Sequence, residues 1–205
     1  MLALELESDR EARVLPLTSG LADDLFEHDG QITEREIRAI TFSSLAPRRG
    51  ELLGDIGAGS GAISIEWRLA HPSMRALAIE SNPERAARIS RNAKSCGVPG
   101  LRVPFSPALQ VGPPTLRTDR EVQAFKPDIA HFVHPALVGA GGLMMAKRLR
   151  VPTLASFHLD LATIARYLGF GFLAPLLWWY MRTTFNAADY VLAPSRRMRQ
   201  EAEAE

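Results

Sequence analysis

A glycine-rich turn between two regular segments constrains this 205-residue sequence more than any other feature. The turn reads DIGAGSG over residues 55–61. The short apolar run before it, Glu51 to Ile56, is expected to be a buried strand, and a helix is expected from Ser60 to Ala70. Glycine is needed where a Cβ would keep the backbone from a ligand, and the helix start offers free N–H groups and a positive dipole end. The pattern therefore predicts a strand–turn–helix unit that binds a ligand.

A carboxylate stands at the end of the next expected strand, Arg75 to Glu80. Glu80 follows Gly61 by 19 residues, and a carboxylate there can accept both ribose hydroxyls of an adenosine ligand. Asp55, two residues before the first glycine, and the third glycine favour S-adenosylmethionine as the cofactor. A dinucleotide stays an alternative, because the first two glycines with Ala62 also fit its fingerprint. A glycine turn without a ligand is the third interpretation.

Strands and helices alternate along the chain. Four more strands are expected, over Leu101–Phe105, Asp128–Val133, Val151–His158 and Tyr190–Ala193. Helix-capping patterns occur at Thr33, Asn82 and Thr118. This alternation predicts an α/β fold with a single doubly wound, Rossmann-like parallel sheet of six strands in the order 3-2-1-4-5-6. In that order Asp128–Val133 lies beside Glu51–Ile56.

Composition limits the partners and hints at two origins. With a net charge of +1, from 24 basic and 23 acidic residues, we expect no nucleic-acid footprint. The single Cys96 suits a reducing compartment, and the N-terminus lacks an apolar signal core, so we expect a cytoplasmic protein.

Residues 1–100 carry 12 basic and 15 acidic residues, against 12 and 8 in residues 101–205. Twelve of the 15 aromatic residues also lie in the second half, which indicates mixed origin.

Three histidines in the second half are candidate functional residues. His131 and His134 point to opposite faces of an expected strand, so we expect no metal site there. His158 and Asp160 lie at the carboxyl end of the next strand, where open α/β sheets bind ligands. They form a candidate catalytic pair in which His158 acts as a base or a hydrogen-bond donor.

An apolar run, LGFGFLAPLLWWYM over Leu168–Met181, is too short to span a bilayer, which takes about 20 residues. We expect no transmembrane segment and favour a buried helix. Contact with a membrane surface stays open as the alternative.

Residues from about 18 to 103 resemble the methyltransferase domain of decarboxylating precorrin-6Y methyltransferases of cobalamin biosynthesis. The matching text is FEHDGQITEREIRA, GELLGDIGAGSGAISIEW and AIESNPERAARISRNA. The resemblance implies methylation and decarboxylation of a corrinoid precursor, with Glu80 on the cofactor ribose and the Asp29–Thr33 loop near the cofactor. A helix entry capped by Thr33 is the alternative for that loop. The implied cofactor-binding residues are Asp29, Gly30, Thr33, Asp55, Gly57, Gly59, Ser60, Gly61 and Glu80.

Residues from about 102 to 200 resemble the N-terminal domain of family 4 glycosyltransferases of the GT-B fold. The matching text includes KPDIAHFVHPALVGAGGLMMAKRLRVPTLASFHLD and ARYLGFGFLAPLLWWYMRTTFNAADYVLAPS. It is most similar to enzymes that glycosylate lipids, and the resemblance implies that His158 lies at a catalytic cleft. The sequence ends at Glu205 without the second domain that holds the nucleotide sugar. We therefore expect no turnover of UDP- or GDP-sugars.

The sequence thus looks like a chimera joined near Leu101 to Val103. We expect an N-terminal lead segment at 1–20, a methyltransferase-like half at 21–103, and a glycosyltransferase-like half at 104–205 that completes the same sheet. The function favoured is binding of S-adenosylmethionine as a small-molecule ligand, with weak or no methyl transfer. The alternatives are a glycosyltransferase-like protein acting on a lipid or sugar acceptor, and a folded chimera without activity.

Overall fold

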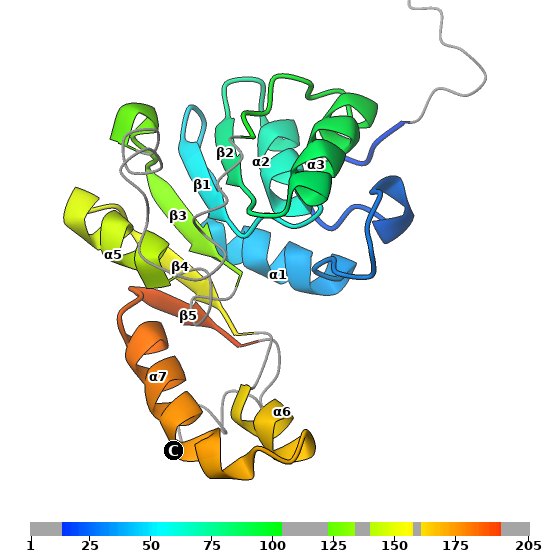
Figure 1. Cartoon of the computed structure of the whole chain (residues 1–205). Coiled ribbons are helices and arrows are strands. Elements are labelled where there is room, and N and C mark those ends of the chain that lie inside the picture. Colours follow the sequence, from blue (N-terminus) through cyan, green and yellow to red (C-terminus); the bar gives the residue numbers. More distant parts are fainter. Residues whose placement is uncertain (1–13, 104–122, 134–139, 158–160, 194–205) are drawn as a thin grey trace, which may run out of the picture.

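Five parallel strands form one sheet in the order β2-β1-β3-β4-β5 (Figure 1). The computed structural model describes residues 14–103, 123–133, 140–157 and 161–193. The strands are β1 (Leu52–Ile56), β2 (Arg75–Ile79), β3 (Ile129–Phe132), β4 (Thr153–Ser156) and β5 (Tyr190–Leu192). Each described strand lies within the range that the sequence predicts for it. The α/β class and the parallel sheet are therefore confirmed.

Helices cover both faces of this sheet. They are η1 (Asp23–Leu25), α1 (Arg35–Leu45), α2 (Ala62–Ala70), α3 (Pro83–Ser95), α5 (Ala140–Leu149), α6 (Leu161–Tyr167), η4 (Gly171–Leu173) and α7 (Ala174–Asn186). Side chains of α2 and α3 enter one apolar core, whereas those of α5 and α7 enter a second core. Alternation along the strands separates the two, since Leu53 and Ala76 belong to the first core and Leu52 and Leu77 to the second.

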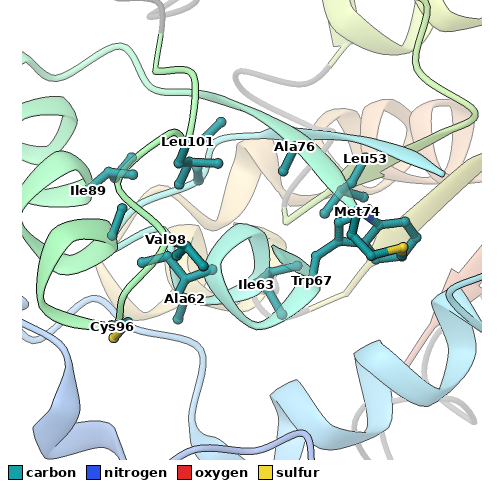
Figure 2. Packing of buried hydrophobic residues seen from close by; sticks show 14 of the residues in the cluster. Leu53, Ala62, Ile63, Trp67, Met74, Ala76, Ile89, Cys96, Val98 and Leu101 are labelled. Atoms are coloured by element: carbon teal, nitrogen blue, oxygen red, sulfur yellow. The ribbon is translucent and has the colours of Figure 1, made fainter. Parts of the chain in front are cut away.

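The first core is the larger packed cluster, and Figure 2 shows its centre. Trp67 of α2 is fully buried there beside Met74, and Phe42 of α1 meets the Trp67 ring edge-on at 6.1 Å between centroids. Ile89 of α3 and Leu101 complete the cluster at its other end (Figure 2). This core fixes α2 and α3 against β1 and β2, and so fixes the turn that joins β1 to α2.

The two halves of the chain meet along β1 and β3. These strands pair in parallel, with Asp55 opposite His131, as the sequence predicts for their ranges. Gly142 of α5 allows close packing over this joint, because a Cβ at Gly142 would lie 3.0 Å from the Phe132 ring and 3.3 Å from Ile56. Both halves therefore contribute to one sheet.

The predicted strand Leu101–Phe105 is not confirmed, because only residues 101–103 of that range are described. Only Arg102 bridges to β2, where it lies parallel to Leu77, and the Ala78 N–H donates to its carbonyl (2.9 Å). Residues 104 and 105 lie outside the described part. The observed sheet thus has five strands, with a single-residue bridge on the outer side of β2.

Of the predicted helix caps, the one at Asn82 is confirmed and the one at Thr33 is wrong. Asn82 caps α3 as predicted, because its side chain accepts the N–H groups of Glu84 and Arg85. The capping box at Thr33 is wrong: Glu34 is the N-cap residue of α1 and makes no side-chain capping hydrogen bond. The Thr33 carbonyl instead accepts a hydrogen bond from Arg38, so tertiary contacts fix this helix start. The Thr118 box lies outside the described residues.

The apolar run 168–181 is only partly the buried helix that we expected. Ala174 and Met181 of α7 are buried, but Leu168, Phe172 and Trp179 are exposed to solvent. The run divides between the turn after α6, η4 and α7 rather than forming one helix. None of the described helices combines the length and apolar character needed to cross a membrane.

Candidate functional site

The glycine turn joins β1 to α2 at the carboxyl edge of the sheet. Gly57, Gly59 and Gly61 all have left-handed φ angles, of 80°, 59° and 80°. The N–H groups of Gly57 and Ala58 donate to the Ile79 carbonyl of β2, which fastens the turn to the neighbouring strand. A Cβ at Gly57 would meet no atom within 4 Å, so the backbone there borders open space.

Gly61 is required for a different reason. A Cβ at Gly61 would lie 2.6 Å from Cγ2 of Ile89, a distance that real Cβ atoms essentially never show. The glycine therefore allows α3 to pack against the start of α2. Its packing role is separate from any contact with a ligand.

Glu80 closes the turn from the end of β2. Its Oε2 accepts the Gly59 N–H (2.9 Å), while Oε1 accepts the N–H groups of Ser81 (2.8 Å) and Asn82 (2.9 Å). The Ser81 hydroxyl lies 3.3 Å from Oε1 as well. Glu80 is 5% exposed, so this carboxylate is both buried and held in one orientation. Sequence spacing predicts its position but not its bond to Gly59.

The 29–33 loop lies against the glycine turn. The Gln31 carbonyl is 3.7 Å from the position that a Cβ on Gly59 would occupy. Asn92 of α3 ties the two segments together, because its amide donates to the carbonyls of Glu27 (3.0 Å) and Ser60 (2.9 Å). The structure thus brings the predicted loop and the predicted turn side by side.

Ion pairs to α3 hold this loop from the outside. Asp29 pairs with Arg85 (2.9 Å) and Arg88 (3.3 Å), and Glu27 pairs with Arg91 (2.8 Å). The hydrogen bond from Arg85, helped by Arg88, lowers the pKa of Asp29 from 3.8 to about 2. Asp29 is therefore ionised at neutral pH, and its charge is already paired within the protein.

A buried arginine also contacts the 29–33 loop, through the Thr33 carbonyl. Arg38 of α1 is fully buried and donates to Glu66 of α2 (2.8 Å), to Asp23 and to the carbonyls of Leu21 and Thr33. Sequence reasoning misses this residue, since an arginine on a helix next to apolar residues gives no local sign that it is buried.

The first part of the chain matches known methyltransferases. A family model described as precorrin methyltransferase domain matches residues 24–112. A precorrin-6Y C(5,15)-methyltransferase [decarboxylating] of Sinorhizobium sp is 65% identical over 101 residues, which cover 49% of this chain. The crystal structure of the C-terminal domain of precorrin-6Y C5,15-methyltransferase from Rhodobacter capsulatus is similar with a TM-score of 0.52 and 30% identity. That similarity covers 75% of this chain and 79% of the other.

The second part matches a different group. A model described as Glycosyltransferase Family 4 matches residues 77–205. Because this second model matches more than half of the chain, the chain belongs to glycosyltransferase family 4, while its first part is similar to the precorrin methyltransferase domain. A GDP-mannose-dependent alpha-mannosyltransferase of Mycobacterium tuberculosis is 38% identical to the family 4 part over 112 residues, which cover 55% of this chain. The chain spans 24% of the length of the Sinorhizobium methyltransferase and 30% of that of this mannosyltransferase. These matches confirm the predicted chimera of a methyltransferase part and a glycosyltransferase part.

A buried polar network crosses the joint between the two parts. Asp55 of the methyltransferase part accepts from the Ser64 hydroxyl (2.8 Å) and lies 3.3 Å from Nδ1 of His131 in the family 4 part. The other ring nitrogen of His131, Nε2, lies 3.0 Å from the Ser156 hydroxyl. Asp55, Ser64 and Ser156 are fully buried and His131 is 1% exposed. The Asp55 side chain thus supports the glycine turn from within the core.

The predicted catalytic pair is not placed by the structure. His158 and Asp160 lie outside the described residues, as does His134. In the described ranges no group of three or more His, Cys, Asp or Glu side chains is arranged to hold a metal ion.

Proposed function

We propose that the precorrin methyltransferase part binds S-adenosylmethionine at the glycine turn. The observation that carries this proposal is the open space over Gly57 next to the buried carboxylate of Glu80. An adenosine ligand needs both features: a backbone that it can approach closely and an acceptor for its ribose. The solved methyltransferase domain that resembles this chain supports the same assignment.

Glu80 has acceptor capacity left for a ribose hydroxyl. A carboxylate oxygen offers about two lone-pair sites. Among the described residues Oε2 accepts only the Gly59 N–H, whereas Oε1 accepts three donors from Ser81 and Asn82. One hydroxyl can therefore bind Oε2 without breaking the loop, and a second would displace the Ser81 hydroxyl. Binding and loop order are coupled through this one side chain.

The remaining residues of the proposed site have supporting roles. The Asp29–Thr33 loop, with Gly30 at a φ of 86°, borders the turn beside Gly59, and Ser60 presents its carbonyl to Asn92. Asp55 acts as a positioning residue through Ser64. We place the boundary between the two parts at 103/104, with Arg102 in the position of strand 3 of the order 3-2-1-4-5-6.

We further propose that methyl transfer is weak or lacking. In the proposed arrangement the acceptor side of the cleft belongs to the family 4 part, whereas the glycine turn belongs to the methyltransferase part. An acceptor must be positioned against the methyl group for the rate to rise, because orientation supplies much of the catalysis. A corrinoid precursor is the acceptor class to test first, on the strength of the relatives' names. We place His158 and Asp160 at the acceptor side.

Calorimetry with S-adenosylhomocysteine tests the proposal directly. We expect a one-site isotherm and a raised thermal midpoint, since a ligand at about 100 times its dissociation constant adds ~2.7 kcal/mol to the free energy of unfolding. NAD and GDP-mannose serve as comparison ligands in the same buffer. No heat at millimolar S-adenosylhomocysteine, in a protein shown to be folded by circular dichroism, would refute the proposal. Binding of NAD or GDP-mannose alone would favour one of the alternative functions.

Two variants locate the ligand. Glu80→Ala removes charge-assisted hydrogen bonds worth ~1.5–3 kcal/mol, so affinity should fall about tenfold or more. Glu36→Ala, at an exposed glutamate in the first turn of α1, is the matched control and should bind as the wild type does. Gly59→Val should abolish binding by occlusion. Gly97→Val carries a similar left-handed backbone strain at the C-terminal end of α3 and should not affect binding. Equal losses in Glu80→Ala and Glu36→Ala would contradict the assignment.

A further inference from the structure

The stretch of chain before α1 is fixed at both ends and exposed between them. At its first end the Glu27 N–H donates to Oδ1 of Asn92 (2.8 Å), and the Glu27 carbonyl accepts from the Asn92 amide (3.0 Å). At its other end the Thr33 carbonyl accepts a hydrogen bond from Arg38. Asn92 and Arg38 are buried, whereas residues 28–31 are exposed. We name residues 28–31 the lid.

The lid lies beside the ribose end of the proposed cofactor site. The Gln31 carbonyl is 3.7 Å from the position that a Cβ on Gly59 would occupy, and the Gly59 N–H donates to Glu80, the proposed ribose acceptor. Gly30 has a φ of 86°, and a Cβ there would meet no atom within 4 Å. Glycine adopts left-handed and right-handed backbone conformations about equally well, so the lid contains its own hinge. It can therefore move without displacing packed side chains.

Asp29 joins the lid to α3. Its Oδ2 pairs with Nε of Arg85 (2.9 Å) and with Nη1 of Arg88 (3.3 Å). The other polar contacts of the lid are internal, because two of its N–H groups donate to its own His28 and Asp29 side chains. Within the described residues, the polar contacts that hold the lid to the rest of the protein thus all pass through one carboxylate.

These ion pairs are partly screened by water. The side chains of Asp29, Arg85 and Arg88 are 34%, 25% and 16% exposed. Pairs near the surface shift an equilibrium by up to about fivefold each. The two arginines also lower the pKa of the Asp29 carboxyl to about 2, so both pairs persist at neutral pH. A contact of this strength holds the lid closed most of the time and still lets it open.

We propose that the lid gates the cofactor site and that Asp29, with Arg85 and Arg88, sets how often it opens. The inference rests on the proposed binding of S-adenosylmethionine at the glycine turn. Each opening admits or releases the ligand beside Gly59, so weaker ion pairs should raise the association and dissociation rates together. The loss of a ligand contact has a different signature, because it mainly raises the dissociation rate.

Surface plasmon resonance of the full chain with S-adenosylhomocysteine measures both rates. In Arg85→Gln with Arg88→Gln we expect each rate to rise about fivefold or more, while the dissociation constant changes less than about twofold. Arg91→Gln is the matched control. Arg91 lies on the same helix and pairs with Glu27 (2.8 Å), whose backbone stays fixed by Asn92, so both rates should stay as in the wild type. A rise in the dissociation rate alone, or equal rates in the double variant and the control, would overturn the proposal.

Salt dependence gives a second test. S-adenosylhomocysteine carries no net charge near neutral pH, so added salt acts on the ion pairs of the protein rather than on steering of the ligand. Asp29→Asn keeps the oxygen that accepts the Gln31 N–H and removes the charge. Raising the salt should accelerate both rates in the wild type and leave those of Asp29→Asn unchanged. The same salt dependence in both proteins would contradict the gate.

Nitrogen relaxation dispersion in the ligand-free protein separates this inference from the cofactor assignment. The method detects exchange between conformations on the μs–ms timescale. We expect exchange at the Gly30 and Gln31 amides, with an open population that rises about fivefold or more in Arg85→Gln with Arg88→Gln and stays the same in Arg91→Gln. Flat profiles at both amides in all three proteins would overturn the gate. This exchange in a protein that does not bind S-adenosylhomocysteine would sustain the moving lid and refute the cofactor. Circular dichroism verifies that each variant is folded.

Discussion

Removing His131 should destabilise the protein by several kcal/mol, because this residue links the two parts through the core. Its ring lies between Asp55 (3.3 Å) and Ser156 (3.0 Å), and all three side chains are buried. His131→Leu keeps the side chain large but leaves Asp55 with Ser64 as its remaining partner among the described residues. A buried polar group without its partner costs ~1–3 kcal/mol. The Asp55 Oδ1 and the Ser156 hydroxyl both lose the His131 ring as their partner, so the expected loss is about 2–6 kcal/mol.

The magnitude is measured by urea unfolding followed by circular dichroism. A second variant distinguishes lost hydrogen bonds from general disruption: Asp55→Val together with His131→Leu replaces both partners by apolar groups. The loss in this double variant should be smaller than the sum of the two single losses, by ~1–3 kcal/mol for residues in one network. His71→Leu is the matched control, because His71 makes a comparable contact with Ser73 (2.8 Å) at the surface.

Two results would refute this reasoning. One is a loss below about 1 kcal/mol for His131→Leu, since an orphaned buried acceptor alone should exceed it. The other is additivity of the Asp55→Val and His131→Leu losses within about 0.5 kcal/mol, which is typical of independent sites. The control should change stability by no more than about 0.5 kcal/mol.

Two further predictions concern the glycine turn and its loop. Gly61→Ala should cost ~1–3 kcal/mol more than Gly97→Ala, because both residues have left-handed φ but only Gly61 faces a side chain, that of Ile89, at 2.6 Å; equal thermal midpoints would contradict this. The Asp29 carboxyl should titrate near its lowered pKa of about 2 by carbon-detected NMR, and Arg85→Gln should raise that midpoint. Because the folded pKa lies below the ordinary aspartate value of 3.8, the pairing stabilises the fold above about pH 4, and this stabilisation is lost as the pH falls through 2. An unchanged midpoint in the Arg85 variant would rule out the ion pair as the cause.

The sequence predicts those features that local rules decide. The Asn82 cap, the strand ranges and the pairing of β1 with β3 follow from residue type, spacing and the topology of parallel sheets. The position of Glu80 directly after β2 also agrees with prediction. In each case the information lies within a few residues or in a recognised family pattern.

The sequence does not predict features that depend on distant partners. The Thr33 box fails because the buried Arg38, tied to Glu66, sets the start of α1 through the Thr33 carbonyl. Among the described residues 101–103 of the predicted third strand, Arg102 alone bridges to β2, since pairing at a sheet edge is decided by the neighbouring chain and not by apolar content. The run 168–181 has no helical or strand period that could show which of its side chains face water.

The two parts of the chain are joined by the pairing of β1 with β3. Backbone hydrogen bonds between β1 and β3 do not depend on side-chain identity, so any parallel strand with a compatible neighbour can pair there. Side chains from both sides of the joint meet between the sheet and α5, where Ile56, Leu77 and Met145 line one small apolar space.

The glycine turn is better protected, because the residues that contact it all lie within the range that the precorrin methyltransferase model matches. Gly59, Glu80, Asn92 and the 29–33 loop lie within the methyltransferase part and hold one another through hydrogen bonds and ion pairs. The family 4 part reaches the turn indirectly, through His131 beneath Asp55. A change at the joint should therefore lower the stability of the whole sheet before it alters the turn itself. Cofactor binding is then expected to survive in a chain whose acceptor side has changed, which is why binding and methyl transfer must be measured separately.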